Sequence, residues 1–147
     1  MTAKTFLHVG LHKTASTSFQ ETCSNNREFL KLRGFNYPEL FSHEGGAKTS
    51  NHSIALFNIF SKSRADYHMN AGKNMISIKK DVARYKHMLL SELLEKDNLI
   101  LSGEDVSDLN VDEQKELSIY LSSFSRQLQA FAVVRSPYSL HCSAFAG

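Results

Sequence analysis

The sequence HVGLHKTASTSFQ, residues 8–20, joins an apolar run to a helical pattern through a short polar turn. The apolar run at residues 6–9 predicts a buried strand that ends at Gly10, and Lys13 follows among serines and threonines. A strand, a tight turn and a helix start direct backbone N–H groups, a lysine and hydroxyls toward one point. This stretch therefore predicts a phosphate-binding loop.

The loop is not a Walker A motif, which requires G-x-x-x-x-G-K-[ST]. Here Gly10 precedes Lys13 by three positions and no second glycine stands before the lysine. A shorter loop can use the same physics, with a point charge from the lysine, hydroxyl donors and the positive end of a helix. An ordinary helix cap beside a solvated lysine explains the spacing equally well, because Ser and Thr favour helix starts.

The rest of the chain alternates apolar runs with helical periodicity. The spacing predicts a helix over residues 14–32 that ends at Gly34, and a short strand at 35–38. Further on, it predicts a short helix with Ile54, Phe57 and Phe60, and a long helix from Met75 to Leu93. A buried strand at residues 99–101, a helix opened by the Asn110 and Glu113 capping box, and a strand at 130–134 follow.

Unbroken apolar strands that alternate with helices favour a parallel sheet covered by helices on both faces. We therefore predict a single domain over residues 1–147, an α/β three-layer sandwich with a mostly parallel central sheet. In such sheets ligands bind beyond the carboxyl ends of the strands. Three polar segments, residues 10–18, 102–107 and 135–138, are expected to converge at that edge.

The composition of the chain excludes several classes of function. With 147 residues, 41% of them hydrophobic, and a formal charge of +2, the chain reads as a soluble protein with no electrostatic case for nucleic acid. The seven histidines show no metal-ligand spacing, so we expect no metal site. Two cysteines and the lack of a long apolar run favour a reducing, cytoplasmic location without a signal peptide or membrane span.

Residues 8–20 resemble the 5′-phosphosulfate loop of the sulfotransferases that use 3′-phosphoadenosine 5′-phosphosulfate (PAPS). Bacterial and carbohydrate-type members read roughly H-I-G-x-x-K-T-G-[ST]-[ST]-[ST]-x-Q. Ala15 stands where the family usually has glycine, and it carries a cost if that position needs a positive φ. The resemblance implies a P-loop-like fold and assigns nucleotide binding to His12, Lys13, Thr14, Ala15, Ser16, Thr17 and Ser18.

A second stretch, AVVRSPY at residues 132–138, is followed by Ser143. It resembles the family's 3′-phosphate element, in which a strand ends in Arg and a later helix bears Ser. Arg135 can grip a phosphate with two hydrogen bonds, and Ser143 lies about two helical turns further on. By itself the stretch reads as a strand, a helix started by proline and a surface arginine. Two elements in the family's order favour the nucleotide site.

The resemblance implies transfer of a sulfuryl group from PAPS to a hydroxyl or amine, with a carbohydrate as the expected acceptor. Such a transfer needs positioning, charge stabilisation and a base. Lys13 is expected to stabilise the leaving phosphate, and Glu104, just past the predicted strand at 99–101, is the first choice for the base. Glu39 and His52 are the alternatives. The segments at residues 42–50 and 61–74 are expected to select the acceptor, whose identity they do not reveal.

Two other interpretations stay open. A small P-loop kinase would need a Walker A motif and a Mg²⁺-binding aspartate after a strand, and neither is recognisable in the sequence. The sequence stops at Gly147, directly after the second motif, whereas relatives continue with further helices. It therefore also fits a fragment, a truncated paralogue or a non-catalytic nucleotide-binding remnant that relies on homo-oligomer formation.

Overall fold

The computed structural model describes residues 2–10, 15–40 and 49–134. Strands and α-helices alternate along these residues, and three short 3-10 helices (η) lie between them. Their bounds are β1 Thr2–Val9, α1 Ser16–Asn25, α2 Arg27–Leu32, β2 Phe35–Asn36, α3 Ser53–Phe60, η1 Arg64–Asp66, η2 His68–Asn70, α4 Met75–Leu94, β3 Asn98–Gly103, η3 Asp105–Asp108, α5 Val111–Phe124 and β4 Ser125–Phe131.

The four strands form one parallel sheet in the order β2-β3-β1-β4. In the centre, β1 pairs with β3 up to Val9 and Gly103, so these two strands end at the same level. On its other side, β1 pairs with β4 up to His8 and Phe131. The prediction of an α/β fold around a parallel sheet is confirmed.

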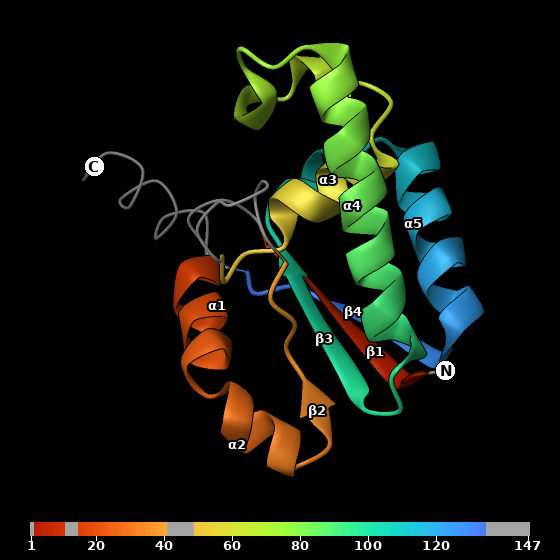
Figure 1. Ribbon diagram of the computed structural model, residues 1–147. Helices are drawn as coiled ribbons and strands as arrows, with labels where there is room; N and C mark the ends of the chain where they lie inside the picture. The colour runs from red at the N-terminus through yellow and green to blue at the C-terminus, as the bar shows by residue number, and fades with distance from the viewer. Residues whose placement is uncertain (1, 11–14, 41–48, 135–147) are drawn as a thin grey trace.

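Helices lie on both sides of the sheet (Figure 1), with α1 and α2 on one side and α4 and α5 on the other. The strands turn Leu7, Leu99 and Leu101 toward α3, α4 and α5, where they join the main hydrophobic core. Toward α1 they turn His8 and Ser102, both completely buried. One face of the sheet therefore buries apolar side chains, and the other face also buries polar ones.

The connections that follow β1 and β3 leave the sheet toward opposite faces. The chain after β1 leads to α1 on one side, while the chain after β3 passes through η3 to α5 on the other side (Figure 1). Because β1 and β3 are neighbours, the two connections diverge at the carboxyl ends of these strands. We call this switch point, which Gly10 and Glu104 border, the crevice. Such a switch point is the usual ligand site of an open α/β sheet.

The first helical region differs from the prediction. One helix was expected over residues 14–32, but the structure has α1 and α2, separated at Asn26. Asn26 has φ −112° and ψ 23°, and its side chain donates a hydrogen bond to the carbonyl oxygen of Thr22. Asparagine competes in this way for backbone groups and so interrupts a helix. Gly34, with φ 76°, ends the region as predicted.

The last strand also differs. The prediction of a strand at residues 130–134 is wrong in its bounds, because β4 runs over Ser125–Phe131 and residues 132–134 lie outside it. The ladder stops at Phe131 because its partner strand has reached His8, next to its own end at Val9. Arg135 is thus four positions beyond the strand end, and not directly after it as expected.

The longer helices match their predictions. α4 buries residues at the predicted spacing of three and four, namely Ile78, Val82, Tyr85, Leu89 and Leu93. α5 begins with the predicted capping box, in which Asn110 and Glu113 each accept a hydrogen bond from the other's backbone N–H. Among the described residues, no helix is both long and apolar enough to cross a membrane.

Candidate functional site

Three residues meet at the crevice between β1 and β3. Gly10 follows the end of β1, Ser16 opens α1, and Glu104 follows the end of β3. A Cβ atom at Gly10 would overlap Oγ of Ser16 and would lie 3.1 Å from Cγ of Glu104. A larger residue at this position would force the hydroxyl of Ser16 and the side chain of Glu104 to shift, because both pack directly against the backbone of Gly10. The predicted convergence of residues 10–18 and 102–107 is thus seen at Gly10, Ser16 and Glu104.

Ala15 adopts a left-handed conformation, with φ 65° and ψ 21°, immediately before α1. It is the only residue other than glycine with a positive φ among those that the structure describes. A left-handed alanine costs about 1–2 kcal/mol, because its Cβ crowds the backbone. The position therefore has a backbone geometry that glycine adopts without strain. From the sequence, alanine is expected to be strained here if φ is positive, and φ is positive.

The start of α1, Ser16–Ser18, carries hydroxyl side chains and no charged side chain. Thr17 and Ser18 are exposed, and neither Asp nor Glu occupies this turn. Ala15, at the cap position, makes no side-chain hydrogen bond to the turn. The helix dipole gives such a helix end a partial positive charge. A negatively charged group at the crevice would be attracted to this end of α1.

Glu104 is half-buried and follows the carboxyl end of β3, across from the start of α1. Its backbone carbonyl accepts hydrogen bonds from both the N–H and the Oγ of Ser107, at 3.0 and 2.8 Å, which fixes the chain as it turns into η3. The next residue, Asp105, is buried and accepts a hydrogen bond from the hydroxyl of Tyr67. Burial raises the pKa of Tyr67, and the hydrogen bond to Asp105 raises it further, so the phenol stays protonated.

The Tyr67 contact also places the segment at residues 61–74, which was expected to select the acceptor. This segment contains η1 and η2, and Tyr67 between them reaches the carboxyl end of β3 through Asp105. Asn70 donates hydrogen bonds to Oδ1 of Asn58 and to the carbonyl of Arg64, at 2.6 and 2.7 Å. The segment is thus anchored beside the crevice by buried polar contacts. Residues 42–48 of the other expected segment, 42–50, lie outside the described residues.

His52, an alternative base, has no ring nitrogen free for proton transfer. The imidazole is completely buried, its Nδ1 accepts from the N–H of Ser102 at 2.9 Å, and its Nε2 donates to the carbonyl of Pro38 at 2.9 Å. Burial lowers the pKa of His52 to about 4, so the ring is neutral at pH 7. Its contacts make it a structural link between β3 and the chain that follows β2.

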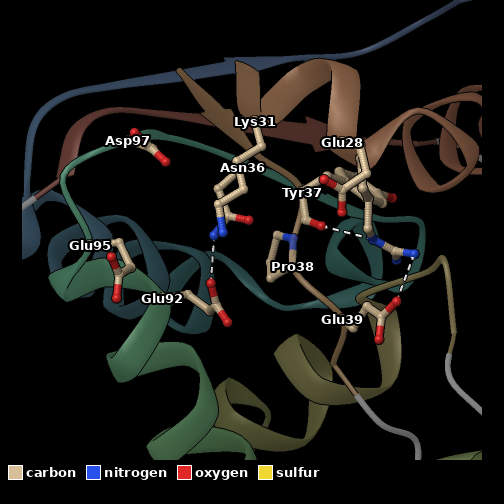
Figure 2. A pocket seen from close by; sticks show the side chains of 10 residues that line it. Glu28, Lys31, Asn36, Tyr37, Pro38, Glu39, Glu92, Glu95 and Asp97 are labelled. Carbon is tan, nitrogen blue, oxygen red and sulfur yellow. Dashed lines mark hydrogen bonds and ion pairs between the residues drawn. The ribbon is translucent and has the colours of Figure 1, made fainter. Parts of the chain in front are cut away.

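Glu39, the other alternative, is committed to an ion pair. Its Oε1 accepts from Nη1 of Arg27 at 3.1 Å, and the same guanidinium donates through Nε to the carbonyl of Tyr37. Both side chains line a cavity of about 340 Å³ at the β2 edge of the sheet, between α2 and the end of α4. Figure 2 shows the lining side chains from these elements around a common space.

The cavity at the β2 edge carries the wrong charge for a phosphate. Its lining includes two cationic side chains, Arg27 and Lys31, and five carboxylates, Glu28, Glu39, Glu92, Glu95 and Asp97. Figure 2 shows Glu92 held by Asn36, while Glu95 and Asp97 stand on the same side of the space. An anionic nucleotide would be repelled here, so the crevice beside Gly10 is the better candidate.

Sequence reasoning missed two buried polar residues beneath the crevice. Nε2 of Gln20, on α1, donates to Oγ of Ser102 at 3.2 Å, and the same oxygen lies 2.8 Å from Nδ1 of His8. Within the described part of the chain, Nε2 of His8 has no hydrogen-bond partner, and the ring packs against both Phe19 and Phe131. Burial lowers the pKa of His8. The one available signal was the serine that interrupts the apolar strand LILSG.

Several predicted site residues lie outside the described residues, so their positions carry no part of the geometry: His12, Lys13, Thr14, Arg135 and Ser143. Among the residues that are described, no three His, Cys, Asp or Glu side chains gather as a metal site would require. The geometry of the site is therefore that of Gly10, Ala15, Ser16 and Glu104.

Comparisons with protein-family models, with curated proteins and with solved structures found no match. The functional assignment therefore rests on the residues and on the geometry of the crevice.

Proposed function

We propose that the chain binds PAPS at the crevice between β1 and β3 and transfers its sulfuryl group to an acceptor hydroxyl or amine. The observation that carries the proposal is the packing of Ser16 and Glu104 against Gly10 at the switch point of the sheet. It joins a helix N-terminus suited to a phosphate with a carboxylate suited to a base. The left-handed backbone of Ala15, where the sulfotransferase loop has glycine, supports the same assignment.

The proposal includes the P-loop-like sulfotransferase fold and a role for each sequence motif. The 5′-phosphate would lie at the start of α1, with Lys13 and the hydroxyls of residues 14–18 as donors. Arg135 and Ser143 would bind the 3′-phosphate, which distinguishes this nucleotide from ATP and ADP. The segment at residues 61–74, anchored through Tyr67 to Asp105, would form part of the acceptor side, and a carbohydrate is the proposed acceptor class.

In the proposed reaction, the acceptor oxygen forms a new bond to sulfur as the bond between sulfur and the bridging phosphate oxygen breaks. The acceptor proton passes to the carboxylate of Glu104, and Lys13 stabilises the negative charge left on the phosphate. Little covalent work falls to the protein, so alignment of the acceptor with the leaving oxygen supplies much of the rate.

Calorimetry with 3′-phosphoadenosine 5′-phosphate (PAP) tests nucleotide binding directly. We expect PAP to bind at least about tenfold more tightly than AMP, since loss of one charge-assisted contact costs about that factor. Arg135→Ala should remove this preference. Absence of binding at millimolar PAP by a folded sample would contradict the proposal, and tighter binding of ATP with Mg²⁺ would favour a kinase. Binding without turnover would favour a non-catalytic remnant.

The base is tested by a matched pair of substitutions, Glu104→Gln and Glu39→Gln. Release of PAP from PAPS would be followed with a chito-oligosaccharide as the probe acceptor. We expect Glu104→Gln to lower kcat by about 10²-fold or more, because proton transfer by a positioned side chain contributes that much. Glu39→Gln should leave kcat nearly unchanged, since its partner is Arg27. The reverse pattern would reassign the base to Glu39.

A further inference from the structure

Ser102 occupies the point where four segments of the chain meet below the crevice. Its Oγ lies 2.8 Å from Nδ1 of His8 on β1 and accepts from Nε2 of Gln20 on α1 at 3.2 Å. Its backbone N–H donates to Nδ1 of His52, and its carbonyl accepts from the N–H of His52, at 2.9 and 2.8 Å. His52 in turn donates to Pro38, after β2. One completely buried residue thus joins β1, β3, α1 and the start of α3.

The residues joined at Ser102 stand close in sequence to the walls of the crevice. His8 is two positions before Gly10, Gln20 is one helical turn after Ser16, and Ser102 is two positions before Glu104. A change in the hydrogen bonds of Ser102 would therefore move the start of α1 relative to Glu104. Displacements of about 1 Å can cost 10²-fold in an aligned reaction, even when the altered residue does not touch the substrate.

α1 buries less apolar surface than α4, so its position depends more on these hydrogen bonds. α1 buries only Ser16, Gln20 and Cys23, whereas α4 buries five large apolar residues. Apolar packing is non-directional, so a helix with little of it can slide or tilt at small cost. A hydrogen bond is directional, and a buried one that loses its partner is costly, which fixes one register.

We infer that Ser102 and Gln20 are positioning residues of the anion site, which hold the start of α1 against Gly10 and Glu104 without touching the ligand. This inference rests on the proposed function for the identity of the anion. It makes a claim of its own about the apo protein, namely that the pair fixes the first turns of α1. The two claims can be measured separately.

The experiment compares Ser102→Ala and Gln20→Met with Asn70→Ala in the full chain. Asn70 is a matched control for PAP binding and not for turnover, because its buried amide also makes two hydrogen bonds but belongs to the segment proposed for the acceptor, whereas PAP occupies the donor side. All three variants should have a lower Tm. Amide exchange would be measured by NMR at Phe19, whose N–H donates to the carbonyl of Ala15 at 3.2 Å, and affinity for PAP by calorimetry well below each Tm.

We expect Ser102→Ala and Gln20→Met to speed exchange at Phe19 at least about tenfold and to weaken PAP binding by a similar factor. Asn70→Ala should change neither quantity. The double variant should be no worse than Ser102→Ala, because both changes remove the same hydrogen bond. Gln20→Met is the milder change and serves if Ser102→Ala does not fold.

Two outcomes overturn different claims. If exchange at Phe19 and PAP affinity in both variants match those of Asn70→Ala, Ser102 and Gln20 contribute only to stability, and the positioning inference is wrong. If the wild-type protein binds no PAP, the proposed function is wrong. In that case, faster exchange at Phe19 in Ser102→Ala than in Asn70→Ala would still support the claim that Ser102 and Gln20 fix the first turns of α1. Equal exchange rates in the two variants would refute that claim.

Discussion

On the face of the sheet that α3, α4 and α5 cover, the strands bury Leu7, Leu99 and Leu101 in a continuous apolar core. On the opposite face, toward α1, they bury His8 and Ser102 in hydrogen bonds and aromatic contacts. The apolar face supplies stability through area removed from water, which depends little on exact placement. The polar face fixes the position of α1 on the sheet, because its hydrogen bonds form only in a narrow range of geometries. The candidate site stands above the second kind of contact.

The largest expected effect tests the apolar face. Leu89→Ala removes a completely buried side chain of α4, and the lost contacts and the cavity should cost about 2–5 kcal/mol of unfolding free energy. Urea denaturation measures this loss. In molecules that remain folded, PAP affinity should not change, since α4 makes no part of the crevice. A matching loss of affinity would show that the two faces are not separable.

The next effect tests the polar contacts around Ser102 through pH, because His52 bonds to the backbone of that residue. His52 has its ordinary pKa of about 6.5 in the unfolded chain and about 4 when folded, so the unfolded chain binds more protons between these values. Stability should therefore fall as pH drops from about 6.5 to 4, by about 3 kcal/mol from this residue. The lowered pKa of His8 acts in the same direction.

Urea denaturation at pH 7, 5.5 and 4.5 measures that slope. His52→Gln removes the titrating ring, and its stability should fall less steeply over the same range even if it is lower at pH 7. An equal slope in the variant would mean that other groups carry the dependence. Leu89→Ala, on the apolar face, should keep the wild-type slope.

A smaller effect concerns the strained residue at the crevice. Ala15→Gly should raise the free energy of unfolding by about 0.5–1 kcal/mol, because relief of the left-handed strain exceeds the added freedom of the unfolded chain. Ala15 is exposed, so no packing is lost. If the backbone at this position approaches a phosphate, PAP affinity should also rise.

Gly34→Ala is the reciprocal control for that substitution. Gly34 has φ 76°, and a Cβ there would meet no atom within 4 Å, so only backbone strain opposes alanine. It should lose about 1 kcal/mol without any change in PAP affinity. A loss of stability in Ala15→Gly would show that the left-handed conformation is not strained at the crevice.

The sequence predicted the elements whose signals are local. α4 was predictable because its apolar residues repeat at helical spacing over five turns, and α5 because Asn110 and Glu113 mark its start. β4 was misplaced because it lies at the edge of the sheet among the described residues, with Arg126, Gln127 and Gln129 exposed, so its pairing leaves no apolar pattern. The apolar residues 132–134 lie beyond the ladder.

The candidate site was predictable in part for the same reason. The approach of Glu104 to the loop follows from strand ends in a parallel sheet, which chain order alone suggests. The hydrogen bonds of Ser102 with His8 and Gln20 join residues 94 and 82 positions apart, and such contacts leave no local periodicity. The buried role of His52 was hidden likewise, because its partners come from β3 and from the chain after β2.

The central position of β1 in the sheet also affects the order in which its two edges can pair during synthesis. Of the four strands that the structure describes, β1 is synthesised first, whereas β4, which pairs with it, ends at Phe131. At ribosomal rates of about 5–20 residues per second, roughly 6–25 s separate the completion of these two strands. During that interval the edge of β1 that pairs with β4 has no β4 to pair with. Pairings of such long sequence separation also slow refolding.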